Sequence, residues 1–220
     1  MTVHIIVRDR NKEFIDAMTE LAASFNGLDR ETVQLTIECG DIFGGMEGFD
    51  AFVSPANSFG FMNGGIDLVY RDRFGMQLEE RVRRAIETLY EGELLVGQAF
   101  ALNATIANDS PLMIVAPTMR VPHPISDYTD VYLATRAAIR TASKHGLCGM
   151  IPLSKANKVL FPGMGTATGR TPYRLAARNM LLGFADGLKQ RRPYVSCAEA
   201  FLDSEKYKTL FVRTRSNDED

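Results

Sequence analysis

Two glycine-rich loops carry the residues whose types and spacing favour contact with an anionic ligand. In the first loop, Asn57 and Asp67 lie ten residues apart. The carboxamide of Asn57 has a donor and an acceptor, which suits the vicinal hydroxyls of a ribose. Between these two residues, Gly64, Gly65 and Ile66 offer backbone amides where a helix is expected to begin, and such amides attract phosphate.

The second loop has the same organisation, a strand followed by a glycine-rich turn and a helix. It consists of Gly163, Met164, Gly165, Thr166, Ala167, Thr168 and Gly169. Two such loops on one cleft would grip a diphosphate from both sides with unpaired amides at positive helix ends. The GxGxxxG spacing, late in the chain, argues against a dinucleotide-binding Rossmann loop, which needs GxGxxG in the first strand-to-helix turn.

Each of these features also has a purely structural interpretation. Asn57 can make an Asx turn, and Asp67 can be a stabilising charge in the first turn of a helix. Glycine turns are common, although two that follow apolar strands are a stronger signal than one. The residues alone leave both interpretations open.

The elements that would hold these loops are short apolar strands and amphipathic helices. We expect strands near residues 3–7, 32–39, 51–53, 98–107, 112–117 and 159–161. We expect helices near residues 14–25, 66–89 with a break at Gly75, 130–144 and 172–188, the last with Thr171 as its N-cap. The succession predicts an α/β fold in which both loops follow the carboxyl ends of strands, where open α/β sheets bind their ligands.

The composition favours an ordinary soluble globular protein, with 45% hydrophobic and 24% charged residues in 220. A net charge of −2 gives no electrostatic reason to expect nucleic acid or an anionic membrane as a partner. Three scattered cysteines and three histidines show neither disulfide, metal-ligand nor Ser-His-Asp spacing, so we expect no metal and no cofactor. No signal peptide or membrane span is recognisable, so we expect a cytoplasmic location.

The run PANSFGFMNGGID, residues 55–67, resembles the signature of macro domains, the ADP-ribose-binding modules. In the macro domains of the MacroD-like hydrolases, an Ala-Asn pair after a strand is followed by a glycine-rich loop that ends in Gly-Gly-Val-Asp. Asn57 and Asp67 match the asparagine and the acid of that motif without a gap. The resemblance implies a three-layer α/β/α sandwich with a mixed central sheet, and it makes Asn57 and Asp67 the candidate catalytic residues.

The resemblance also implies ligand contacts in three segments. The run of Gly40, Asp41 and Ile42 is similar to the family's Gly-Asp-Ile segment, in which the carboxylate accepts from the adenine amine and the next amide contacts the ring. Asp41 also has a purely structural interpretation, as a residue that ends a strand and caps a turn. In the second loop, Ala167 replaces a usual glycine, and the aromatic residue usual near Gly169 is missing. Phe59 or Phe61 is a candidate to replace that ring.

Three functions remain open at this level. The first is hydrolysis of an ADP-ribose conjugate: a mono-ADP-ribosyl ester on protein, O-acetyl-ADP-ribose or ADP-ribose 1''-phosphate. The second is a non-catalytic module that binds ADP-ribose or an ADP-ribosylated molecule, and the third is a scaffold without a ligand. We assign residues 1–190 to the macro domain and residues 191–220 to a C-terminal extension with an acidic tail, and we interpret residues 148–157 as an insertion with strand character at Met150 and Ile151.

Overall fold

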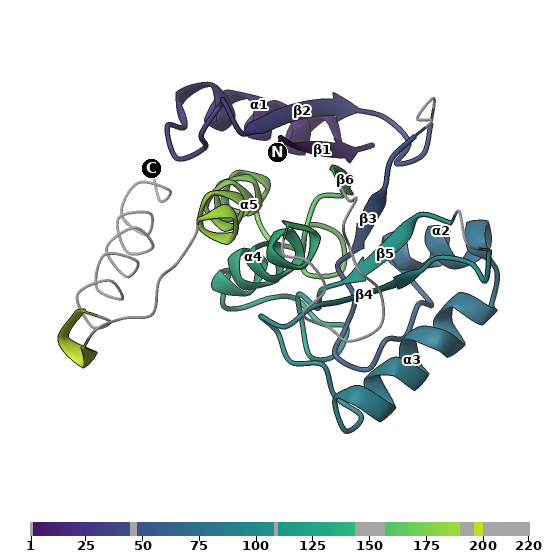
Figure 1. Cartoon of the computed structure of the whole chain (residues 1–220). Coiled ribbons are helices and arrows are strands. Elements are labelled where there is room, and N and C mark those ends of the chain that lie inside the picture. Colours follow the sequence, from purple (N-terminus) through teal and green to yellow (C-terminus); the bar gives the residue numbers. More distant parts are fainter. Residues whose placement is uncertain (1, 45–47, 108–109, 144–156, 190–195, 200–220) are drawn as a thin grey trace. The chain divides into compact units, whose positions relative to one another are not determined.

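A computed structural model describes residues 2–44, 48–107, 110–143, 157–189 and 196–199 of the chain (Figure 1). The chain divides into two compact units, residues 1–188 and residues 189–220, and all the helices and strands named below lie in the first. Almost all of the expected insertion at residues 148–157 and most of the C-terminal extension fall outside the described residues. No helix in the described part of the chain is long and apolar enough to span a membrane.

Six strands form one mixed sheet in the order β2-β1-β6-β3-β5-β4. Their bounds are Val3–Asp9 for β1, Val33–Cys39 for β2, Ala51–Ser54 for β3, Phe100–Asn103 for β4, Leu112–Val115 for β5 and Lys158–Phe161 for β6. All neighbouring strands pair in parallel except β4, which is antiparallel to β5. Three of the inner strands, β6, β3 and β5, are only four residues long and are mostly apolar, because helices cover both faces of the sheet.

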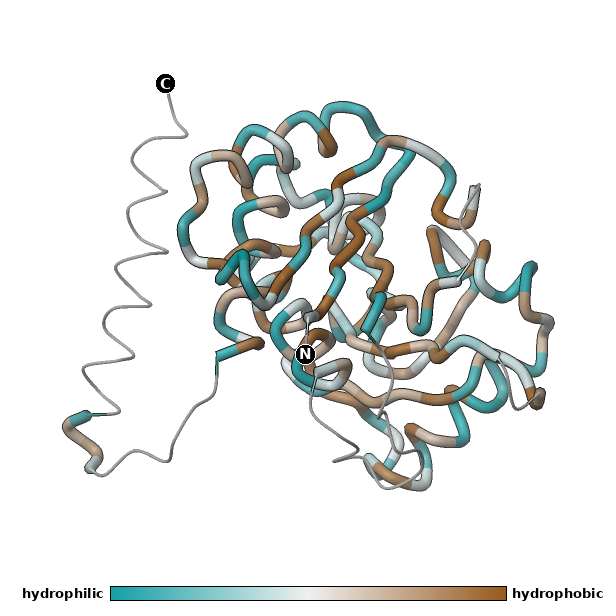
Figure 2. Tube along the Cα trace, turned by 45° about the horizontal axis from the view of Figure 1, so that its top comes forward, coloured by the Kyte–Doolittle hydropathy of each residue, from teal (hydrophilic) through white to brown (hydrophobic). Residues whose placement is uncertain are grey.

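The helices form two layers around this sheet, which makes the three-layer α/β/α sandwich expected from the sequence (Figure 1). One layer and its core contain α1 (Lys12–Ser24), α4 (Thr129–Ser143) and α5 (Tyr173–Leu188). The other contains α2 (Gly65–Phe74) and α3 (Gln77–Leu89). The strands between the two layers carry long hydrophobic stretches (Figure 2). Burial of these apolar faces is the main stabilising contribution to such a fold.

Two glycines allow α4 and α5 to pack unusually closely. A Cβ atom on Gly187 would lie 2.2 Å from Ile139 Cγ2 and 2.9 Å from the carbonyl oxygen of Arg136, and one on Gly183 would lie 2.8 Å from Thr135 Cβ. The same helix pair holds a buried Asp186, which forms an ion pair with Arg136 at 2.5 Å. The close approach fixes α5, whose first residues border the second glycine-rich loop.

The expected elements are confirmed with shifts at their ends, and one local prediction is wrong. The break at Gly75 separates α2 from α3, and Gly75 has a positive φ of 92°. Thr171 is not the N-cap of α5, because the carbonyl of Pro172 accepts the first helical bond from Ala176 at 2.9 Å. The Thr171 hydroxyl is buried and has no hydrogen-bond partner among the described residues, while its backbone amide donates to the carbonyl of Gly165 in the loop.

Candidate functional site

The carboxyl ends of four neighbouring strands border one cavity of about 420 Å³. In the order of the sheet, these are the ends of β2, β1, β6 and β3. Every candidate site residue from the sequence lines this cavity: Asp41, Ile42, Asn57, Gly64, Gly65, Ile66, Asp67, Gly163, Gly165, Thr166, Ala167, Thr168 and Gly169. The parallel sheet therefore brings together segments that are more than 120 residues apart in the chain.

Asn57 forms the Asx turn that was one interpretation of the sequence. Its Oδ1 accepts hydrogen bonds from the amides of Phe59 at 3.2 Å and Phe61 at 3.3 Å, and its Nδ2 donates to the carbonyl of Phe61 at 2.9 Å. The residue is buried but still borders the cavity. Because the amide has two hydrogens, one donor of Asn57 is left after these bonds. Of the two phenylalanines bonded in this way, Phe61 lines the cavity and Phe59 does not.

Asp67 is a buried carboxyl group in the first turn of α2. Its Oδ1 accepts a hydrogen bond from the hydroxyl of Ser54, the last residue of β3, at 2.5 Å. Burial raises the pKa of Asp67 to about 7, the bond from Ser54 opposes this rise, and the charge of Glu79 adds to it. Near neutral pH the group is therefore present in both protonation states, and its ionised form can accept a proton.

Asp41 holds its carboxylate at the β2 end of the cavity. Its Oδ1 accepts from the amide of Phe43 at 3.0 Å, and its Oδ2 forms an ion pair with the exposed guanidinium of Arg10. The bond from Phe43, followed by the bond from Arg10, lowers the pKa of Asp41. The carboxylate is thus ionised at neutral pH and acts only as an acceptor. The neighbouring side chain of Ile42 is buried in the core.

The second loop folds back on itself at the end of β6. Gly165 has a positive φ of 71°, and a Cβ on Gly169 would lie 2.5 Å from the Gly165 carbonyl oxygen, so both positions require glycine. The amide of Gly163 donates to Asp9 Oδ2 at 3.0 Å. The amide of Gly163 therefore already has an acceptor within the protein, whereas the residues Ala167 and Thr168 of the same loop are exposed.

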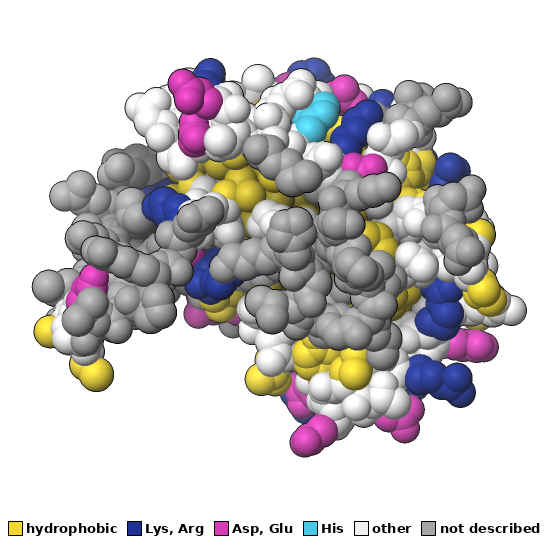
Figure 3. Space-filling model, viewed as in Figure 1, with side chains coloured by type: hydrophobic (Ala, Val, Ile, Leu, Met, Phe, Trp, Pro, Cys, Tyr) yellow, Lys and Arg dark blue, Asp and Glu magenta, His cyan; other side chains and the backbone are white. Residues whose placement is uncertain are grey.

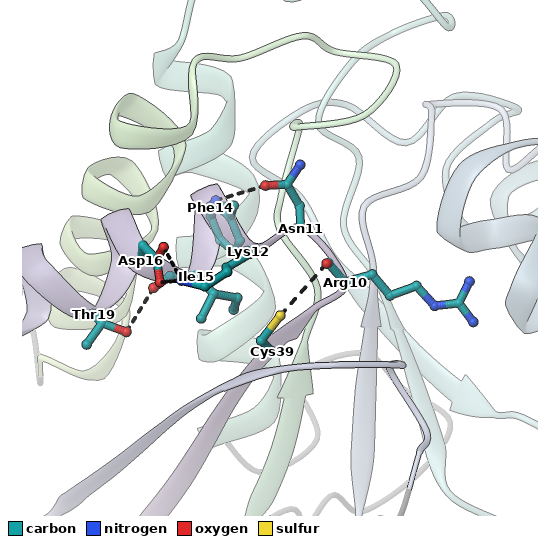
Figure 4. Close-up of polar contacts among 8 residues, drawn as sticks. All are labelled: Arg10, Asn11, Lys12, Phe14, Ile15, Asp16, Thr19 and Cys39. Atoms are coloured by element: carbon teal, nitrogen blue, oxygen red, sulfur yellow. Dashed lines mark hydrogen bonds and ion pairs between the residues drawn. The ribbon is translucent and has the colours of Figure 1, made fainter.

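The cavity lining also contains residues that the sequence did not predict as site residues, among them Asp9, Asn11 and Tyr173. Asp9 ends β1 and ties it to the second loop through Gly163. Asn11 is the N-cap of α1, accepting from the amide of Phe14 at 3.0 Å (Figure 4), and its Nδ2 donates to the Tyr173 hydroxyl at 2.8 Å. An Asn just before an amphipathic helix is a recognisable N-cap signal, but its contact with Tyr173 depends on the folded chain.

Side chains of both charges line the cavity, with Arg8 and Arg10 beside Asp9, Asp41 and Asp67. On the face shown in Figure 3, side chains of both signs are spread over the described surface and do not form one basic field. Among the described residues, no group of three or more His, Cys, Asp or Glu side chains could hold a metal ion. Arg8 and Arg10 line the cavity, but each is paired with a carboxylate, so an anion there would depend mainly on backbone amides and helix ends.

Comparison with known sequences agrees with this geometry. The family model described as Macro domain matches residues 53–180, which include Asn57, Asp67 and the second loop but begin after Asp41. An uncharacterized protein of Aquifex aeolicus (strain VF5) is 37% identical over 132 residues, which cover 60% of this chain and 70% of that protein.

Three solved structures share the fold. The Oceanobacillus iheyensis macrodomain with ADP has a TM-score of 0.54 and 19% identity, covering 79% of this chain and 90% of its own. The macrodomain of Mycobacterium tuberculosis DarG has a TM-score of 0.51 and 20% identity, covering 67% and 87%. Thermosipho africanus DarTG in complex with ADP-ribose has a TM-score of 0.51 and 14% identity, covering 84% and 54%.

Proposed function

This chain belongs to the macro domain family, and on that premise we propose that it binds ADP-ribose in the cavity and hydrolyses a conjugate at the distal ribose. One observation carries the proposal. Asp41, the second loop and the loop from Asn57 to Asp67 border one cavity at successive positions along the sheet edge. A ligand with a base, a diphosphate and a terminal ribose has its groups in the same order.

The order of the strands supports one arrangement of the ligand along the cavity. The adenine amine lies at Asp41, at the end of β2, because an ionised carboxylate accepts from an amine and not from the carbonyl of guanine. The diphosphate lies between the amides of the second loop and the start of α2, where the positive end of the helix dipole favours negative charge. The distal ribose then lies at Asn57 and Asp67.

Asp67 supplies the chemistry as a proton acceptor. The oxygen of a water molecule forms a bond to the anomeric carbon of the distal ribose, and the bond between that carbon and the conjugated oxygen breaks. The water proton passes to the Asp67 carboxylate, and the released group leaves as a carboxylate or phosphate anion. The pKa of about 7 supports this role, because general bases work best when their pKa is near the operating pH.

The substrates that fit this step carry the leaving oxygen on the anomeric carbon. They are a mono-ADP-ribosyl ester on an acidic side chain of a protein, O-acetyl-ADP-ribose with its acetyl group on the 1''-oxygen, and ADP-ribose 1''-phosphate. All three would release ADP-ribose, so one product assay compares them.

A second candidate is a non-catalytic reader of ADP-ribose, and two contacts favour it. One oxygen of Asp67 is occupied by Ser54, and most of the hydrogen-bonding capacity of Asn57 is used in its own loop. In a reader, Asp67 would stabilise the start of α2 and Asn57 would shape the loop.

The test is release of ADP-ribose from the three substrates, measured beside direct binding, for the wild type and two variants. Asp67→Ala should lower turnover about 10²-fold or more with little change in affinity, because a general base acts mainly in the transition state. Asn57→Ala should weaken binding and also slow the reaction, because the loop loses its geometry. Asp72→Ala, an exposed carboxylate on the same helix, is the matched control.

A wild type that binds ADP-ribose but releases none from any of the three substrates would overturn the enzymatic proposal and leave the reader. A wild type that does not bind ADP-ribose would overturn both.

A further inference from the structure

We propose that the Tyr173 hydroxyl recognises the ribose next to the base, so that the cavity distinguishes ribonucleotides from deoxyribonucleotides. This inference rests on the proposed binding of ADP-ribose and adds a specificity-determining residue to it. Tyr173 is the first residue of α5, is half-buried and lines the cavity.

The hydroxyl of Tyr173 is held in place by a side chain that is itself fixed. Asn11 Oδ1 accepts from the amide of Phe14, so the Asn11 nitrogen must point away from α1, as Figure 4 shows. That nitrogen donates to the Tyr173 hydroxyl at 2.8 Å. Because the hydroxyl accepts this bond, its own proton is left to donate, and no acceptor for it is found in the described part of the chain.

The position of this pair along the cavity identifies the part of the ligand it meets. Asn11 follows the end of β1, and β1 lies between β2, which carries Asp41 at its end, and β6, which leads into the second loop. A ligand with its base at Asp41 and its diphosphate at the second loop places the ribose that joins them over the end of β1. That ribose carries two hydroxyl groups, each a donor and an acceptor.

The local charge favours a hydroxyl over a phosphate at this point. The carboxylate of Asp9 borders the same part of the cavity and accepts from the amides of Asn11 at 2.8 Å and Gly163 at 3.0 Å. The neighbouring Arg8 and Arg10 also line the cavity but are paired with other carboxylates, those of Glu38 and Asp41. A phosphate beside Asp9 would therefore meet a like charge, whereas a ribose hydroxyl can accept from Tyr173 without repulsion.

The experiment compares three nucleotides that lack the distal ribose: ADP, 2'-deoxy-ADP and 3'-deoxy-ADP. Each is titrated by calorimetry into the full chain as wild type, Tyr173→Phe and Tyr128→Phe, the last an exposed tyrosine outside the cavity lining. The wild type and Tyr128→Phe should bind the deoxy nucleotide that lacks the recognised ribose hydroxyl about 3- to 10-fold more weakly than ADP, which is the range for one neutral hydrogen bond. Tyr173→Phe should bind ADP more weakly than the wild type does, by a similar factor. In this variant the affinities for ADP and for that deoxy nucleotide should differ by less than about 2-fold.

Asn11→Ser provides a second variant, because serine is also a good N-cap but has no amide nitrogen to hold Tyr173. It should reduce the discrimination between ADP and the deoxy nucleotide without the loss of α1 stability expected for alanine. Asn11 is then a positioning residue.

Three outcomes would overturn the inference. In the first, both deoxy nucleotides bind the wild type as tightly as ADP does. In the second, Tyr173→Phe still loses affinity by the full factor of about 3 to 10 when the ribose hydroxyl is removed. In the third, Tyr173→Phe binds all three nucleotides more weakly by the same factor, which would assign the tyrosine hydroxyl to a phosphate. If the wild type binds ADP-ribose and one of these holds, the proposed function stands without this contact. If it binds no nucleotide at all, both fall.

Discussion

Ser54 Oγ lies 2.5 Å from Asp67 Oδ1, and both residues are buried. The bond joins the last residue of β3 to the first turn of α2, and it opposes the effect of burial on the pKa of Asp67. Burial raises its pKa, and the hydroxyl of Ser54 lowers it, with a result of about 7. The protonation of a single carboxyl group thus connects the stability of this fold to the chemistry proposed for it.

The rate of hydrolysis should depend on this titration. Because the ionised form of Asp67 accepts the proton, kcat/KM should rise with pH through about 7 and level off above it. Ser54→Ala removes the bond that lowers the pKa, so the midpoint should move upward by about one pH unit. The measurement is the pH profile of kcat/KM, with the exposed Ser24→Ala as control. A midpoint that stays fixed in Ser54→Ala would separate the profile from Asp67.

Asp67 should also make the folded protein less stable at higher pH. Its pKa is raised on folding, so its favourable contribution is complete below the unfolded pKa of about 3.8 and is lost as pH rises to about 7. Asp67→Asn, which cannot ionise, should therefore gain stability over the wild type between pH 5 and pH 8, on the order of a few kcal/mol. Thermal unfolding at several pH values tests this, and a stability difference that does not change with pH would contradict it.

The base contact can be tested separately from catalysis. Asp41→Ala should weaken ADP-ribose binding by about 1 to 3 kcal/mol, the range for a hydrogen bond to a charged group, and reduce discrimination against a guanine analogue. Stability should change little, because the ion pair with Arg10 is exposed. Glu38→Ala is the matched control, since Glu38 of β2 pairs with Arg8 of the neighbouring strand β1 but does not itself line the cavity. Unchanged affinity in a folded Asp41→Ala protein would remove Asp41 from the site.

The close packing of α4 and α5 predicts a stability change of unusual sign. In an exposed helix, glycine to alanine stabilises by up to about 1 kcal/mol. Gly187→Ala should instead destabilise by about 1 to 3 kcal/mol, because the new Cβ would lie 2.2 Å from Ile139 and 2.9 Å from backbone. Chemical denaturation measures the difference. A stabilised Gly187→Ala would show that the helices can separate without cost.

The sequence predicts the general fold and the two loops that line the cavity for identifiable reasons. Short apolar runs that end in Pro or Gly predicted β3 and β6, and glycine spacing predicted the loops that follow them. Because parallel strands place their carboxyl ends at one edge, the convergence of these loops on one cavity could be expected.

The remaining details depend on contacts between distant segments, which local patterns do not encode. The bond from Ser54 to Asp67 and the bond from Asp9 to Gly163 are of this kind. The wrong N-cap has the same origin, because Thr171 is held by Gly165 in the folded loop and not by its own helix. The domain boundary near residue 190 stays a prediction.

Calorimetric titration of ADP-ribose into the full chain tests the central claim most directly. We expect saturable binding with one ADP-ribose per chain, and we expect this binding to be weakened in Asp41→Ala and nearly unchanged in Glu38→Ala. A folded wild type that shows no saturable binding up to millimolar ADP-ribose would contradict it, and the cavity would then serve another ligand or none.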